Sequence, residues 1–211
     1  MANSNGAFGL RPIGVVGQAA NTTGATEYRI AAGNTNTIFQ GSPVIPLSTG
    51  FIDKVGAAAG GTVGLVGVFW GCEYVSSTTG ETIFANNWPG SGADTNHPVK
   101  AFVYDNPMQT FVICSDASLT SEATATGHVF ANANFADGAA GSSTTGISSA
   151  KLGVSTIATT ANLNLRIMGI QDDPENSDFT AAGIPVIVRL NNSFNSANGA
   201  IAGGTVSTTG V

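Results

Sequence analysis

The chain has 211 residues and a formal net charge of −6, and only 9% of its residues are charged, against roughly a quarter in an average globular protein. The 42% of hydrophobic residues suffices for a sizeable core. The seven basic residues are scattered along the sequence, so no cluster is expected to neutralise a run of phosphates, which excludes nucleic acid and anionic membranes as expected partners.

A polar, uncharged surface follows from this composition. Such a surface suits a coat or shell protein packed in many copies, because few charges mean little repulsion between copies. It suits a secreted or surface-exposed β protein equally well. Residues 1–6 lack the basic and apolar regions of a signal peptide, and no stretch approaches the ~18 apolar residues of a membrane span, so we expect synthesis in a cytoplasm.

Residues 1–26 are predicted to be extended. Apolar residues mix with glycine and proline up to residue 16, Pro12 keeps Arg11 out of the helical region, and residues 18–26 form a polar spacer. Such a segment can be the first strand of the domain itself, or an arm that docks on a partner by strand addition. The residues alone leave both readings open.

Short strands are expected between residues 27 and 55. Residues 27–30 and 51–55 are the candidates, and the segment 37–47, interrupted by glycine and two prolines, suits a turn that leads into an edge strand.

The longest apolar run, residues 63–75, is predicted to be the central strand. Read with period two, one face is continuous and bulky, which indicates that it points into a core. Its residues are Val66, Val68, Trp70, Cys72 and Tyr74. The other face sets Phe69 between Gly67 and Gly71, and glycines on a strand face often mark close approach by another segment.

The next segments are predicted to form hairpins. Residues 76–81 are a turn after which 82–84 pair back, and Trp88 anchors the irregular loop 86–92. Further along, the two strand-like runs 99–104 and 110–114 flank five turn-forming residues, 105–109. We expect these two runs to form a hairpin with each other.

Residues 116–162, rich in Ala, Ser, Thr and Gly, are predicted to be an excursion from the β domain. Ser118 or Thr120 can cap one or two helical turns there, and a second short helix is expected at 148–152. Strands return at 163–170 and 184–191. The last strand has one apolar face, made of Ile184, Val186, Val188 and Leu190.

The predicted organisation is therefore an extended N-terminal arm at 1–26, an all-β domain at 27–191, and a flexible C-terminal tail at 192–211. Short helices and long loops complete the expected fold.

No residue pattern nominates an active site, a metal site or a cofactor site. His97 and His128 lack metal-ligand spacing, and the acidic loop 172–178 offers oxygen ligands but not the spacing of a calcium-binding EF-hand loop. Cys72 and Cys114 lie in apolar runs and are interpreted as buried thiols, with a single disulfide as the alternative. An enzyme is the least favoured class.

Several short motifs, in this order, are similar to virion proteins of tailed bacteriophages, including marine phages. The opening Met-Ala-Asn leads into Phe8-Gly9-Leu10-Arg11-Pro12, and the later motifs are Gly41–Val44, Gly67–Tyr74, Val103–Pro107, Gly146–Ser148 and Leu165–Gly169. The resemblance spans most of the chain from Phe8 to Leu190. It implies a capsid decoration, or cement, protein.

The resemblance implies a compact β-barrel or β-tulip module on the capsid exterior. It also implies a homotrimer at local three-fold positions, with the major capsid protein as partner and an N-terminal arm reaching onto it. The residues expected to dock are Phe8, Leu10, Arg11, Pro12 and Ile13. Phe69 and Trp88, the latter in the loop 86–92, are candidates for an interface between subunits.

Two other structural roles compete with this one. A carbohydrate- or host-surface-binding virion module would use Trp88, Tyr104 and the polar loops for stacking and hydrogen bonding. The major capsid protein of tailed phages needs a long spine helix, and no window of this sequence has the apolar period of 3.6 that such a helix requires.

Overall fold

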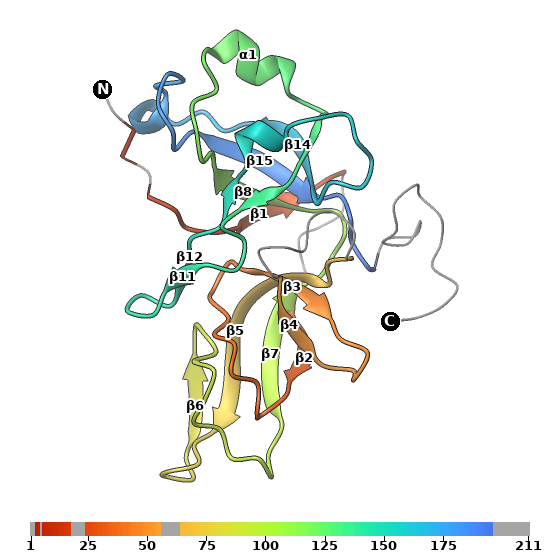
Figure 1. The fold of residues 1–211 in the computed structure, drawn as a ribbon, viewed down its shortest axis with the longest axis vertical. Helices are drawn as coiled ribbons and strands as arrows, with labels where there is room; N and C mark the ends of the chain where they lie inside the picture. Colours follow the sequence, from red (N-terminus) through yellow and green to blue (C-terminus); the bar gives the residue numbers. More distant parts are fainter. Residues whose placement is uncertain (1–2, 5, 18–23, 56–63, 196–211) are drawn as a thin grey trace.

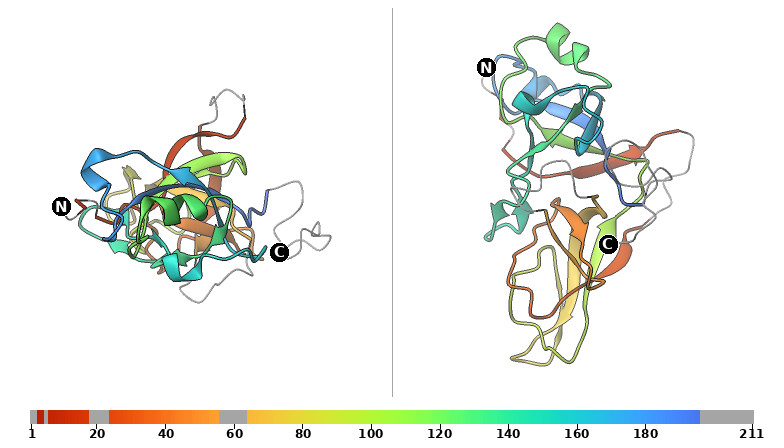
Figure 2. Two further views of the ribbon diagram at one scale, coloured as in Figure 1. Left: turned by 90° about the horizontal axis from the view of Figure 1, so that it is seen from above. Right: turned by 45° about the vertical axis from the view of Figure 1, so that its right-hand side comes forward.

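The computed structural model describes residues 3–4, 6–17, 24–55 and 64–195, and it confirms an all-β fold with a single short α-helix in that part of the chain. The molecule is elongated and has two lobes, which Figure 1 shows one above the other and Figure 2 shows from two further sides. We call residues 6–17 and 109–191 the upper lobe and residues 26–104 the lower lobe.

Each lobe is built on one large sheet. The upper sheet has the strand order β1-β8-β15-β14-β9. Its strands are β1 Arg11–Val15, β8 Gln109–Cys114, β9 Asn132–Ala133, β14 Leu165–Ile170 and β15 Pro185–Leu190. The lower sheet has the order β2-β7-β5-β3-β4, with β6 paired to β5. Its strands are β2 Thr26–Ile30, β3 Pro43–Pro46, β4 Ile52–Lys54, β5 Gly67–Val75, β6 Thr82–Ala85 and β7 Val99–Tyr104.

Smaller elements complete the upper part of the molecule. Two short ribbons pair β10 with β13 and β11 with β12, and one α-helix and two 3₁₀-helices lie in the loops. Their bounds are β10 Phe135–Ala136, β11 Gly141–Ser142, β12 Ile147–Ser148, β13 Lys151–Leu152, α1 Glu122–Gly127, η1 Val154–Thr156 and η2 Pro174–Asn176. The sheets of the described residues include no closed barrel, so the expected barrel is replaced by two open sheets.

The predicted hairpin between β7 and β8 is wrong. Both strands form, but β7 pairs with β2 and β5 in the lower sheet, whereas β8 pairs with β1 and β15 in the upper sheet. Residues 105–108 therefore cross from one lobe to the other. Each strand has two partners elsewhere, and that long-range pairing overrides the local turn preference.

The central strand is interrupted by a β-bulge between Phe69 and Gly71, which makes Trp70 an extra residue opposite β7. Because a bulge reverses the alternation of faces, Phe69 joins Cys72 in the lower core, and Trp70 lies half-buried, edge-on to the ring of Tyr104. The prediction that Phe69 and Cys72 lie on opposite faces is therefore wrong. The expected close approach at the glycines is confirmed, since a Cβ on Gly67 would lie 2.2 Å from the Tyr104 carbonyl oxygen.

Two large apolar clusters fill the lobes, and a small third cluster joins Phe8, Val112 and Cys114. The lower core draws every member from residues 28–103, with Phe69 and Trp88 at its centre. The upper core draws on both lobes, because Val55, Leu65 and Val68 pack there with residues of β8, β14 and β15. The predicted apolar face of β15 is confirmed as buried.

The excursion 116–162 is ordered structure that closes the upper lobe. The helix α1 is capped by the Ser121 side chain, one residue beyond the expected caps. The predicted helix at 148–152 is wrong, since β12 and β13 lie there and Ser148 donates its N–H to the Gln40 carbonyl oxygen. The predicted tail is anchored at its start, because Ser193 is buried and Leu65 bonds to the backbone of Asn192 and Phe194, while residues 196–211 lie outside the described residues.

Candidate functional site

The predicted docking arm contains β1, residues Arg11–Val15, which is a strand of the chain's own sheet. β1 pairs with β8, and the Leu10 N–H donates to the Gly41 carbonyl oxygen over 3.0 Å. Leu10 is fully buried in the upper core and Phe8 is 8% exposed. Docking through Phe8 and Leu10 is therefore wrong, because these two side chains already fill the chain's own interior.

The other three predicted docking residues stay nearer the surface. Arg11 is exposed, with its guanidinium carbon 4.2 Å from the centre of the Phe8 ring, and Pro12 is partly exposed. Ile13 is 49% exposed and lies at an irregularity in the pairing of β1 with β8.

Phe69 and Trp88 are interior residues, so neither offers a surface to a neighbouring subunit. Both have no exposed area. The Trp88 indole N–H donates to the Asn34 carbonyl oxygen over 3.1 Å, and its ring meets Tyr74 edge-on at 5.4 Å between centroids. Trp88 anchors its loop as predicted, and its role is to hold the lower lobe together.

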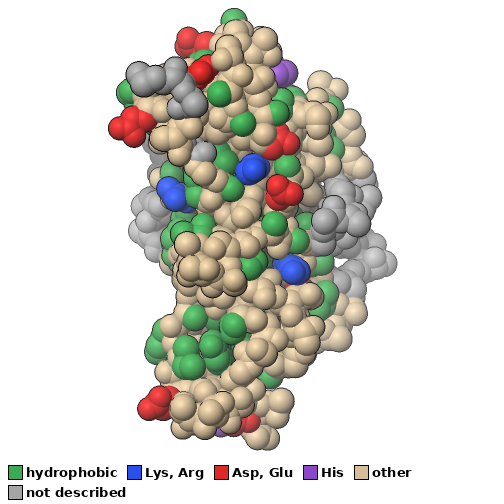
Figure 3. Space-filling view, turned by 60° about the vertical axis from the view of Figure 1, so that its left-hand side comes forward, with side chains coloured by type: hydrophobic (Ala, Val, Ile, Leu, Met, Phe, Trp, Pro, Cys, Tyr) green, Lys and Arg blue, Asp and Glu red, His purple; other side chains and the backbone are tan. Residues whose placement is uncertain are grey.

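Two phenylalanines with large exposed side chains lie in different lobes of the molecule. Phe84 is 72% exposed on β6 of the lower lobe, and Phe130 is 74% exposed just after α1 of the upper lobe. Apolar side chains also gather on one face of the lower lobe (Figure 3). Aromatic residues are enriched in the buried cores of protein interfaces, where a few residues carry most of the binding energy.

Phe130 is presented by a strained backbone. Its φ of +72° is in the left-handed region, which a bulky residue seldom adopts and which costs about 1–3 kcal/mol. The strain is held by hydrogen bonds from the Phe130 N–H to the Ile167 carbonyl oxygen (2.9 Å) and from the Ile167 N–H to the Ala131 carbonyl oxygen. This geometry directs an aromatic ring outward on a fixed backbone.

Sequence reasoning missed both residues. The sequence pattern places Phe84 in a strand that pairs back after a turn, and it places Phe130 in the segment rich in Ala, Ser, Thr and Gly. The available signal for Phe130 was that it is the one Phe, Tyr or Trp between Phe111 and Phe135.

A polar cleft of about 420 Å³ opens where the crossing loop leaves the lower lobe. Asp105 accepts hydrogen bonds from the hydroxyls of Thr26 and Tyr28, both at 2.9 Å, and Asn195 donates to the Tyr28 hydroxyl. Burial, offset in part by the Asn195 hydrogen bond, raises the pKa of Tyr28. Tyr104, which was predicted as a stacking residue, also lines the cleft.

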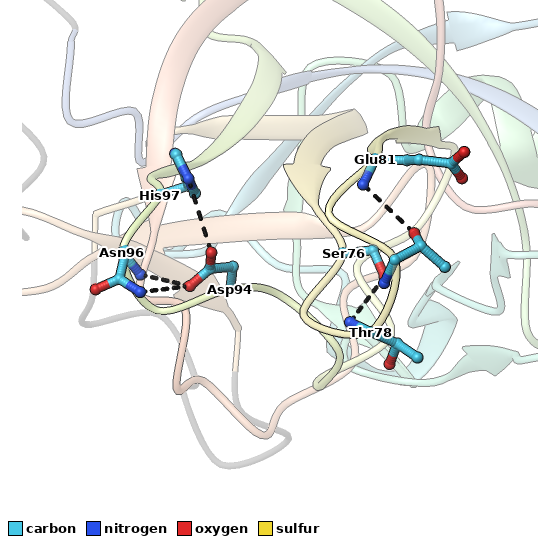
Figure 4. A network of polar contacts seen from close by, with 7 residues as sticks. Ser76, Thr78, Glu81, Asp94, Asn96 and His97 are labelled. Atoms are coloured by element: carbon cyan, nitrogen blue, oxygen red, sulfur yellow. Dashed lines mark hydrogen bonds and ion pairs between the residues drawn. The ribbon is translucent and has the colours of Figure 1, made fainter.

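The histidines take part in structural contacts. His97 lies 3.7 Å from Asp94, whose pKa is lowered chiefly by the backbone N–H of Asn96, and nearby the Ser76 hydroxyl accepts from Thr78 (Figure 4). His128 forms the C-cap of α1. The described residues contain no group of three or more His, Cys, Asp or Glu side chains placed to hold a metal ion.

Both cysteines are free and buried, as their apolar surroundings indicated, and they belong to different apolar clusters. Burial raises the pKa of the Cys72 thiol to about 12 and raises that of Cys114 as well. These thiols are accordingly protonated at neutral pH and unsuited to nucleophilic chemistry.

The chain matches no family model, no curated protein and no solved structure at a significant level. No helix among the described residues is long and apolar enough to cross a membrane.

Proposed function

We propose that this chain is a structural virion protein that decorates an icosahedral phage head and stabilises it by bridging neighbouring capsid subunits. The observation that carries the proposal is the pair of exposed phenylalanines, Phe84 on β6 of the lower lobe and Phe130 after α1 of the upper lobe, on one body. A bridge needs two separated contacts on a rigid connector, and here the upper core includes residues of both lobes.

Each of the two contacts with the head needs only a modest affinity. A packaged genome pushes outward on its shell, and a clamp adds contacts that must break together. Linking two weak contacts through one rigid body raises the effective affinity by roughly 10²–10⁴. The low content of charged residues also limits repulsion between densely packed copies.

The proposed partner is the major capsid protein, and the proposed assembled form is a homotrimer. The proposed docking residues are Phe84 and Phe130 instead of the N-terminal arm. Electron microscopy of the virion tests it. We expect density for this chain as knobs on the outer surface of the head, spanning adjacent capsid subunits. Density in the shell floor, or none on the head, would contradict it.

A second candidate is a carbohydrate-binding virion module, favoured by the cleft around Tyr28, Tyr104 and Asp105. Its volume lies in the range of small-molecule sites, and it combines aromatic rings with hydrogen-bonding groups. Binding of neutral glycans on an array, lost in Asp105→Ala, would favour this function over the first.

A further inference from the structure

The fold brings together two arginines that are far apart in the sequence. Arg166 of β14 and Arg189 of β15 are directly opposite each other in the antiparallel pairing, so their side chains leave the same face of the upper sheet. Like charges placed directly opposite each other destabilise a sheet. A pairing of two of the chain's seven basic residues in this way therefore needs a physical explanation.

The neighbours on this row do not neutralise the two charges. Asn132 lies beside Arg166 and Thr110 beside Arg189, and both are uncharged. The five strands of the upper sheet contain no aspartate or glutamate at all. Arg11 projects from the same face, because it is opposite Val112, two residues along β8 from Thr110.

The guanidinium groups use few of their donors. Arg166 donates its Nε–H to the Asn132 side-chain oxygen over 3.1 Å, and Arg189 reaches only the Met108 sulfur, at 3.5 Å. The Nε of Arg189 is buried and has no hydrogen-bond partner among the described residues. Burial, and then the charge of Arg166, lower the pKa of Arg189. Five N–H donors on each group leave a forked donor set available.

The lower sheet provides an internal comparison. Arg29 and Lys100 are likewise directly opposite each other, but Glu73 is opposite Lys100 on the other side, and Lys100 Nζ lies 3.2 Å from the Glu73 carboxylate. The lower like-charge pair thus has its counter-ion in the same sheet, whereas the part of the chain that the structure describes places no carboxylate in an ion pair with Arg166 or Arg189.

We propose that Arg166 and Arg189 form a carboxylate-binding site, which takes an aspartate or glutamate side chain presented by the protein on which this chain docks. The planar guanidinium fork matches the two oxygens of a carboxylate, and such charge-assisted bonds are stronger than neutral ones. A single carboxylate also offsets the repulsion between the two arginines. The net charge of −6 disfavours an extended polyanion such as nucleic acid.

Only the source of the carboxylate rests on the proposed docking function, so the site itself is tested with the isolated full-length chain. The measurement is a titration with succinate, at constant ionic strength, followed through the NMR signals of the arginine Nε–H groups. We expect saturable shifts at Arg166 and Arg189, and at least about a tenfold loss of affinity in Arg166→Gln and in Arg189→Gln. Arg29→Gln, which removes one charge from the lower sheet, should bind succinate as the wild type does.

Two further arms distinguish the anion and its source. A soluble peptide with adjacent aspartates should compete with succinate for the same signals, whereas inorganic phosphate should bind more weakly. Absence of saturation with succinate, equal loss of binding in Arg29→Gln, or tighter binding of phosphate would each overturn the proposal. If succinate binds but the chain does not bind phage heads, the site stands and the decoration function fails.

A stability measurement provides an independent check on folded variants. Without added anion, Arg189→Gln should unfold at a higher temperature than the wild type, because it removes a buried unpartnered group and a like-charge contact. A lower unfolding temperature would contradict the premise that the two charges are uncompensated.

Discussion

The two lobes depend on each other unequally. Every member of the lower core lies between residues 28 and 103, so the lower lobe is one continuous segment with a self-contained interior. The upper lobe combines β1, which precedes that segment in the sequence, with the strands from β8 to β15, which follow it. Its core also includes three buried residues of the lower lobe. The lower lobe is thus inserted between two strands, β1 and β8, that pair with each other.

This inequality indicates how such a body gains rigidity. Val55, Leu65 and Val68 extend from the lower lobe into the upper core, and Leu65 also bonds to the backbone of Asn192 and Phe194. The upper core is therefore complete only when the lower lobe is in place. Local unfolding is expected to begin in the upper lobe, whose contacts join residues more distant in sequence.

The largest effect is expected for Trp88→Ala. Truncating a buried tryptophan costs about 3–5 kcal/mol, and here it should destabilise both lobes, because the upper lobe rests on the lower one. Amide hydrogen exchange measured strand by strand checks this, with loss of protection expected in β5, β7, β8 and β15 together.

The matched change in the upper core is Phe111→Ala, which removes an equally buried aromatic ring. It should reduce protection in β8, β14 and β15 while β5 and β7 keep theirs. Equal loss in both lobes for this variant would show that the lobes unfold as one unit.

Leu10→Ala should cost about 2–5 kcal/mol, because Leu10 is fully buried in the upper core. Chemical denaturation followed by near-ultraviolet circular dichroism measures the change. The exposed neighbour Ile13 supplies the control, since Ile13→Ala should change stability much less. A Leu10 variant as stable as the wild type would restore the idea of a detachable N-terminal arm.

Alkaline pH should weaken the lower lobe. The pKa of Cys72 is raised to about 12 in the folded chain, so folding favours the protonated thiol. Its contribution to stability is complete below the ordinary thiol pKa near 9 and is lost as the pH rises toward 12, at about 1.4 kcal/mol per pH unit. Cys72→Ala should show a shallower fall in unfolding free energy above pH 9, and an unchanged slope would contradict the burial argument.

Phe130→Gly should have the smallest effect on stability, and a favourable one. Glycine adopts a φ of +72° without steric cost, and the lost side chain is 74% exposed, so we expect a gain of up to about 1 kcal/mol. Thermal unfolding measures it. A clear loss of stability would mean that the ring packs on the upper lobe in the folded chain.

Much of the fold could be predicted from local patterns. Strands at 27–30, 99–104, 110–114 and 184–191 follow from runs of apolar and β-branched residues bounded by turn formers, and these strands formed. Their partners could not be predicted, because a β-strand pattern specifies a face and not a neighbour. The turn 105–109 looked like a hairpin and serves as the crossing between lobes.

The candidate sites could not be predicted from the sequence, because they also depend on which strands pair. Arg166 and Arg189 are separated by an acidic loop and appear scattered in the sequence, and only the pairing of β14 with β15 places them together. The bulge at Trp70 moved Phe69 into the core, and a single inserted residue of this kind has no clear sequence signal.

Co-sedimentation with expanded phage heads tests whether Phe84 and Phe130 both contact the head, as we propose. The variants are Phe84→Ser, Phe130→Gly and the double change, with Ile13→Ala as an exposed apolar control. We predict that each single change weakens head binding at least about tenfold, that the double change abolishes it, and that all variants stay folded. Head binding by the double variant as tight as that of the wild type would mean that neither phenylalanine docks on the head.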